Sequence, residues 1–131
     1  MIRNFTPHDI HIMREEDTRF DASIRKFVGS GDTTPLMSIP SEGMLSAKMD
    51  REYVGIVDGC PMYRKVYRDV DDIPASVGAN DKVVVSALYL AAYEAVNGSA
   101  DPRLVTIMDP VYDSSDTRRI IGSIGIGNCE K

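Results

Sequence analysis

The sequence offers a small set of polar residues that could bind or transform a ligand. Asn4, Thr6 and His8 alternate along a segment predicted to be extended, so their side chains share one face and can line a pocket. The same parity places His8 toward the core, and its alternative role is structural, as a histidine that hydrogen-bonds to backbone. A hydrolase with His8 as its base is a further alternative, but no partnered nucleophile is visible. We therefore assign no catalytic residue.

Ser86 stands where a run of valines passes into a helical pattern, which is the position of a nucleophile elbow. The surrounding V-V-V-S-A-L lacks the glycines that the strained elbow turn requires, so we predict a helix N-cap instead. The free N–H groups of that helix could hold an anion, and Arg103, Arg118 and Arg119 bracket the last two predicted strands and could share it. The predicted ligand-binding set is Asn4, Thr6, His8, Ser86, Arg103, Arg118 and Arg119.

No metal or cofactor is expected. His8 and His11 would project from opposite faces of a strand, which disfavours a zinc pair. Asp109, Asp113 and Asp116 lack the spacing and the central glycine of a calcium loop, and we interpret them as turn residues.

Composition limits the class of protein. The chain has 131 residues, of which 43% are hydrophobic and 27% charged, as expected for one folded domain over residues 1–131. Its net charge of -5, without a basic run, disfavours nucleic acid as a partner. We predict a cytoplasmic chain with Cys60 and Cys129 reduced, because no signal peptide or spanning segment is evident.

The elements that position these residues centre on the segment 82–96. Its three valines predict a buried strand, and the following Ala-rich residues predict a helix that ends at Asn97-Gly98. A helical projection turns the stripe of Leu88, Ala91, Ala92, Ala95 and Val96 toward the sheet. It leaves Tyr89, Leu90 and Tyr93 as an exposed apolar surface, and hence predicts a symmetric homo-oligomer.

The remaining segments indicate strands. Asp58-Gly59 predicts a tight hairpin between residues 53–57 and 60–67, with Pro61 at an edge or at a non-bonded site. Residues 15–31 fit a short amphipathic helix, a loop or an irregular strand. Further strands are expected at 8–13, 36–39, 44–49, 104–108 (ended by Asp109-Pro110) and 119–126. The predicted fold is α+β: a mostly antiparallel sheet of about six strands with the 87–96 helix packed on one face.

Several short motifs occur in an order that resembles a group of small uncharacterised proteins from bacteria and their phages. They are N-F-T-P-H-D-I, S-I-P-S-E-G, G-C-P-M, V-V-V-S-A-L, D-P-R-L-V and R-I-I-G. The chain departs from that group in having P-S-E-G for P-S-G, and in lacking the acidic residue expected after Arg103, which is followed by Leu104 and Val105. Residues 15–33 look like an insertion relative to the group.

The resemblance implies a phage or prophage accessory protein with a host-takeover or anti-defence role. Small proteins of this kind bind a host protein or sequester a signalling nucleotide. We therefore expect a non-enzymatic protein that binds a small anionic host ligand of the nucleotide class. The alternative is a protein-binding inhibitor that uses the acidic surface and the outer face of the helix.

Overall fold

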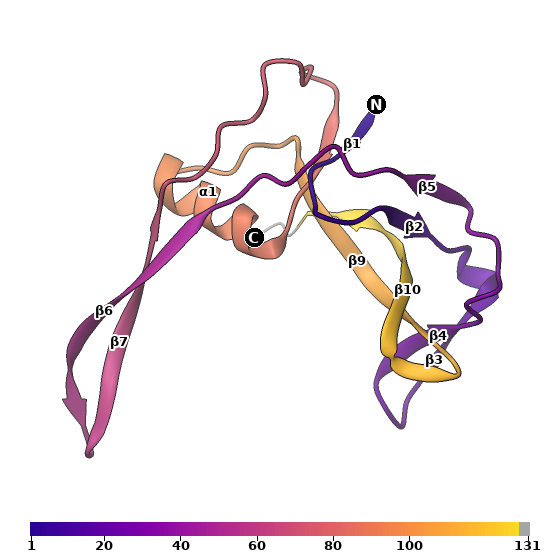
Figure 1. Ribbon diagram of the computed structural model, residues 1–131, viewed down its shortest axis with the longest axis horizontal. Coiled ribbons are helices and arrows are strands. Elements are labelled where there is room, and N and C mark those ends of the chain that lie inside the picture. The colour runs from indigo at the N-terminus through magenta and orange to yellow at the C-terminus, as the bar shows by residue number, and fades with distance from the viewer. Residues whose placement is uncertain (129–131) are drawn as a thin grey trace.

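The computed structural model describes residues 1–128, so Cys129 lies outside the described residues. Ten strands and one α-helix occur in the described part of the chain (Figure 1). In order they are β1 (Ile2–Asn4), β2 (Ile10–Ile12), the 3-10 helix η1 (Glu15–Asp17), β3 (Thr18–Asp21), β4 (Lys26–Gly29), β5 (Met37–Ile39), β6 (Lys48–Val57), β7 (Cys60–Arg68), β8 (Lys82–Val84), α1 (Ala87–Asn97), β9 (Leu104–Asp113) and β10 (Asp116–Gly127).

The main sheet has eight strands and mixes parallel with antiparallel pairs. Its path runs β1-β8-β9-β10-β2-β5, and β4, paired with β3, joins β9. The pairs β1–β8, β8–β9, β4–β9 and β10–β2 are parallel. A parallel bridge between Asn4 and Ser41 joins the two ends of the path, so the sheet is nearly closed on itself. The prediction of a mostly antiparallel sheet of about six strands was therefore wrong, because parallel pairing between distant segments leaves no local pattern.

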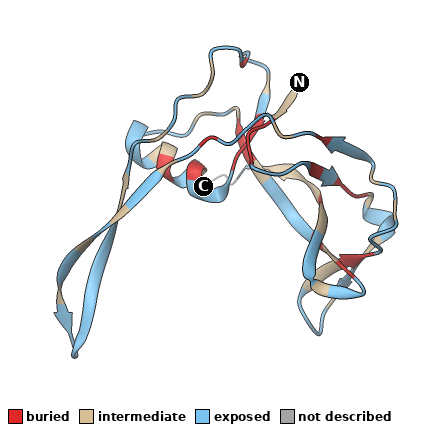
Figure 2. Cartoon of the chain, viewed as in Figure 1, coloured by how far each residue is buried: buried red, intermediate tan, exposed pale blue. Residues whose placement is uncertain are grey.

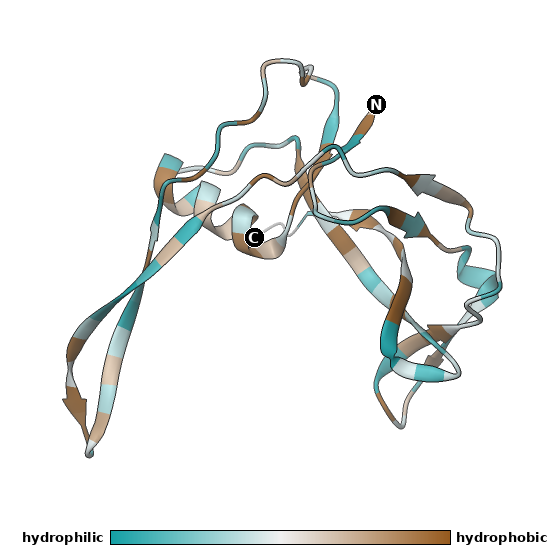
Figure 3. Cartoon of the chain, viewed as in Figure 1, coloured by the Kyte–Doolittle hydropathy of each residue, from teal (hydrophilic) through white to brown (hydrophobic). Residues whose placement is uncertain are grey.

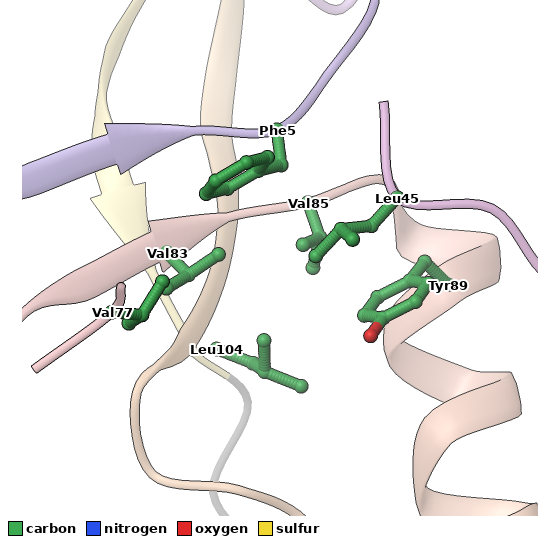
Figure 4. Packing of buried hydrophobic residues seen from close by; sticks show 7 residues of the cluster. All are labelled: Phe5, Leu45, Val77, Val83, Val85, Tyr89 and Leu104. Atoms are coloured by element: carbon green, nitrogen blue, oxygen red, sulfur yellow. The ribbon is translucent and has the colours of Figure 1, made fainter. Parts of the chain in front are cut away.

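The predicted valine strand is the centre of the molecule. Val83 and Val85 belong to one buried cluster with Phe5, Tyr89 and Leu104 (Figure 4), whereas Val84, facing the other way, belongs to a second cluster of isoleucines and Val105. Both faces of β8 are thus buried, as a continuous run of β-branched residues predicts. Figure 2 shows buried residues concentrated where β1, β8 and β9 meet.

The helix has the predicted bounds, but its orientation differs from the prediction. Ser86 caps its first turn, and Gly98 ends it at φ 81°. Tyr89 is 1% exposed and packs in the first cluster, whereas Leu88 and Val96 are 45% and 49% exposed. The helix is apolar on most sides, so the projection could not identify the buried face. It contacts β7 and β9 instead of covering one face of the sheet.

Residues 48–68 form a separate two-stranded arm, which extends away from the rest of the molecule (Figure 1). Asp58 and Gly59 take φ values of 51° and 79° at its turn, which confirms the predicted hairpin. The arm is longer than predicted because β6 begins at Lys48. Strand β7 pairs only with β6, so Pro61 lies in an edge strand, as predicted.

Two segments differ from the prediction through pairing. Residues 15–31 form η1 and the β3–β4 hairpin, in which the Phe20 and Phe27 rings meet edge to face at 5.2 Å. Strand β9 does not end at Asp109-Pro110 but continues to Asp113. Pro110 is tolerated because β8 pairs with the start of β9 and β4 with its end, leaving Pro110 without a partner on that edge.

Candidate functional site

Two adjoining cavities lie beside the turn that precedes β2. One has a volume of about 560 Å³ and the other about 650 Å³. Five residues line both: His8, Asp9, His11, Ile120 and Ile121. A single ligand that occupied both cavities would therefore contact His8 and His11.

The first cavity is largely apolar. Ile10 and Val85 form part of its wall, with Ile107 of β9 and Ile120 of β10. Ile107 is 41% exposed and Ile120 is 58% exposed, which leaves hydrophobic surface uncovered at its rim. Ser86 and Ala87 bring the start of α1 to the same cavity. Such a space suits a flat or apolar group with few hydrogen-bonding atoms.

The second cavity is polar and has one cationic residue in its lining. That residue is Arg119, and His11 lies opposite Ser38 in the β2–β5 pair. The Nδ1 of His11 is 2.8 Å from the Ser38 Oγ, so the ring is held while its Nε2 is not used in that contact. Asp9 adds an acidic group, although its Oδ1 already accepts a hydrogen bond from the Ser41 N–H at 2.8 Å.

Asn4 and Thr6 do not line the cavities together, although both were predicted to do so. Asn4 is fully buried, and its Nδ2 donates to the carbonyls of His8 and Ile39 at 2.9 and 3.0 Å. Thr6 is 8% exposed and donates from its Oγ1 to the Asn4 Oδ1. These residues stabilise the turn between β1 and β2. Of the pair, only Thr6 reaches the apolar cavity.

His8 is exposed, whereas parity predicted that it would point toward the core. The prediction was wrong because residues 6–8 form bends and β2 begins only at Ile10. Parity does hold within β2, where Ile10 and Ile12 are buried and His11 is exposed. The turn held by Asn4 presents His8 to both cavities.

Ser86 is an N-cap, as predicted. Its Oγ accepts a hydrogen bond from the Tyr89 N–H at 3.1 Å. The N–H groups of Ala87 and Leu88 lie in the first turn, where helix geometry provides no carbonyl partner. Ala87 is one of the residues that line the apolar cavity.

The three predicted arginines are separated. Arg103 donates from Nη2 to Asp101 at 2.9 Å and from Nη1 to the Val77 carbonyl, away from both cavities. The hydrogen bond from Arg103 lowers the pKa of the Asp101 carboxyl. Arg118 pairs with Asp116 at 3.2 Å and is not at either cavity. Only Arg119 lines a cavity, and its 4.0 Å contact with Asp113 is long for an ion pair.

The predicted interface on the helix is not an exposed surface. Tyr89 is buried, and its hydroxyl donates to the Asp71 carbonyl at 2.6 Å. Leu90 and Tyr93 are half-buried against the same cluster. The prediction that Tyr89 is exposed was therefore wrong, whereas Leu90 and Tyr93 keep part of their surface in solvent.

Two site residues were missed at the sequence level, His11 as a cavity residue and Ser38. His11 is exposed on β2 and lines both cavities, and nothing local in the sequence indicates that β5, which carries Ser38, pairs with β2. Residues 1–128 contain no cluster of three or more His, Cys, Asp or Glu side chains that could hold a metal ion. Asp113 accepts hydrogen bonds from the Ser115 N–H and Oγ, which confirms its role in a turn.

Within the described residues, no helix has the length and apolar character needed to cross a membrane. Neither a protein-family model nor a curated protein nor a solved structure matches this chain.

Proposed function

We propose that this chain is a non-enzymatic binding protein for a small anionic ligand of the nucleotide class. The observation that supports this most is the junction of an apolar cavity with a polar, cation-bearing one, both lined by His8 and His11. A nucleotide combines a flat, largely apolar base with a charged phosphate. The isoleucine-lined cavity suits the base, and Arg119 with the histidines suits the phosphate.

The geometry favours binding over turnover. His8 has no serine, threonine or cysteine partner within hydrogen-bond distance among the described residues, and Ser86 is engaged as a cap. The His11–Ser38 pair lacks a third group that orients the imidazole, within the same part of the chain. Such an orienting partner is the usual feature of an activated nucleophile.

The biological setting that we propose is a phage or prophage accessory protein in the host cytoplasm, which sequesters a nucleotide immune signal. This part of the proposal rests on the order of the sequence motifs. The net charge of -5 is compatible with a small ligand held in a local basic site, and it disfavours nucleic acid.

The proposal is tested by the melting temperature of the purified chain with a broad panel of mono-, di- and cyclic nucleotides. A ligand at 100 times its dissociation constant stabilises the folded state by about 2.7 kcal/mol, which raises the melting temperature by several degrees. We expect at least one nucleotide to do so, and mass spectrometry after denaturation should recover it unchanged. A panel without any shift, or recovery of a cleaved product, would contradict the proposal.

A further inference from the structure

The β6–β7 arm concentrates exposed hydrophobic side chains. Figure 3 shows apolar residues near its tip, and Figure 2 shows that the arm is almost entirely exposed. Seven large apolar side chains on it are between 42% and 65% exposed: Met49, Tyr53, Val54, Ile56, Val57, Met62 and Tyr63. Exposed apolar side chains gathered on one element in this way usually mark a site of protein association.

The arm is joined to the rest of the molecule by contacts between β7 and α1, and not by strand pairing. Strands β6 and β7 pair only with each other, so each keeps one free edge. The side-chain contacts within it are surface contacts, such as the Tyr53–Tyr63 ring pair at 5.8 Å and the Arg68–Asp50 ion pair at 3.1 Å. A two-stranded hairpin is marginally stable in water unless a further element packs on it.

Charge indicates what that further element is. Residues 48–68 contain five Lys and Arg and three Asp and Glu, a net charge of +2. The other 110 residues contain ten Lys and Arg and seventeen Asp and Glu, a net charge of -7. We call these other residues the body. Two arms repel each other, whereas an arm and a body attract, so the chain is complementary to itself in an arm-to-body arrangement.

We propose that the β6–β7 arm of one copy docks on the body of a second copy of this chain. The apolar tip supplies buried area, and the basic residues Arg51, Lys48 and Lys65 supply attraction to the acidic body. Reciprocal exchange of arms between two copies gives a closed twofold dimer without exposed arms. This interface uses the arm and not the helix, and it does not depend on the ligand proposal.

The first test is the mass of the full chain in solution by sedimentation velocity over a range of concentrations. We expect a dimer or a larger closed assembly. Ile56→Glu should weaken association at least tenfold, because it places a carboxylate in the apolar contact. A monomeric wild type, or association unchanged by Ile56→Glu, would overturn the proposal.

Ile56→Glu could also disturb the hairpin itself, so a second variant is needed. Lys65→Glu keeps every apolar residue of the arm, and Lys65 is exposed. It should weaken association with an unchanged far-ultraviolet circular dichroism spectrum, and raising the salt concentration should weaken the wild type in the same direction. Association that is indifferent to both the charge reversal and salt contradicts the arm-to-body arrangement.

The free and exposed Cys60 at the tip of the arm provides a direct probe. A photoreactive maleimide on Cys60 of a Cys129→Ser chain can be cross-linked in a mixture of light and nitrogen-15 labelled protein. Cross-linked peptides that join Cys60 of one copy to body residues of the other support the proposal. Cross-links confined to one copy, or joining tip to tip, overturn it.

Discussion

The Oγ1 of Thr6 donates a 2.6 Å hydrogen bond to the Oδ1 of Asn4, and both residues are buried beneath the turn that carries His8. The Thr6 N–H reaches the same oxygen at 2.9 Å, while the Asn4 Nδ2 serves two backbone carbonyls. Asn4 therefore links β1, the turn and β5 through one amide group. The position of His8 beside the two cavities depends on this amide.

Asn4→Ala should lower the free energy of unfolding by about 2–4 kcal/mol, because it leaves buried carbonyl and N–H groups without partners. Asn97→Ala is the matched control, since Asn97 donates one exposed hydrogen bond to the Tyr93 carbonyl. The control should cost less than about 1 kcal/mol. Urea unfolding measures both, and equal losses would contradict the structural role of Asn4.

Gly122 is required where β10 passes β2. A Cβ at this residue would lie 2.6 Å from the His11 carbonyl oxygen and 2.8 Å from the Met13 Cγ. Gly122→Ala should therefore destabilise the protein by about 1–3 kcal/mol, because the backbone of β2 must move. At Gly125 an added Cβ meets nothing within 4 Å, and Gly125→Ala should be neutral or slightly stabilising. Thermal unfolding of the two variants decides this, and similar melting temperatures would contradict the close approach.

Tyr89 should make stability sensitive to alkaline pH. Burial, and secondarily the neighbouring Tyr93, raises its pKa from about 10 to about 12. The unfolded chain loses the Tyr89 proton at lower pH than the folded chain does. Its stabilising effect is thus complete below pH 10 and declines as the pH rises toward 12. Tyr89→Phe should show a shallower loss of stability between these values in urea unfolding. An identical pH profile in wild type and variant would refute this account.

Glu42 should contribute at the acid end. The Arg3 guanidinium donates to both of its oxygens, with two of the bonds at 2.8 Å, and this lowers the pKa of the Glu42 carboxyl. The carboxylate stabilises the folded state above its ordinary pKa near 4.5, and this effect is lost as the pH falls through the lowered value. Glu42→Gln should therefore flatten the acid limb of the stability profile. An unchanged acid limb would contradict this account, since it would show that the Arg3–Glu42 pair, beside the Asn4–Ser41 bridge, does not affect the free energy of unfolding.

Local features were predictable because local physics decides them. The Asp58-Gly59 turn, the Ser86 cap and the buried valines of β8 each follow from backbone preference or from a continuous apolar run. The parallel pairs and the near closure of the sheet depend on contacts between distant segments, which no local period encodes. The ends of the helix were predicted correctly because Ser86 and Gly98 mark them. Its orientation was predicted wrongly because apolar residues lie on most of its sides.

The candidate site was predictable only in part. His8, Thr6, Ser86 and Arg119 line the cavities, whereas Asn4 supports them from beneath and Arg103 and Arg118 lie elsewhere. An arginine gives no sequence signal that distinguishes a cavity wall from an exposed hairpin, since Arg118 and Arg119 are adjacent. His11 and Ser38 meet only because β2 and β5 pair in one register.

The adjacent residues Arg118 and Arg119 provide the most direct test of the polar cavity, because only Arg119 lines it. Calorimetric titration with the most stabilising nucleotide of the panel should compare wild type, Arg119→Glu and Arg118→Glu. Loss of a charge-assisted hydrogen bond costs about 1.5–3 kcal/mol, so Arg119→Glu should weaken binding roughly tenfold to a hundredfold. Arg118→Glu, whose side chain is 91% exposed outside both cavities, should bind within about twofold of wild type. Equal affinities for the two variants would contradict the assignment of the anionic group to the cavity lined by Arg119.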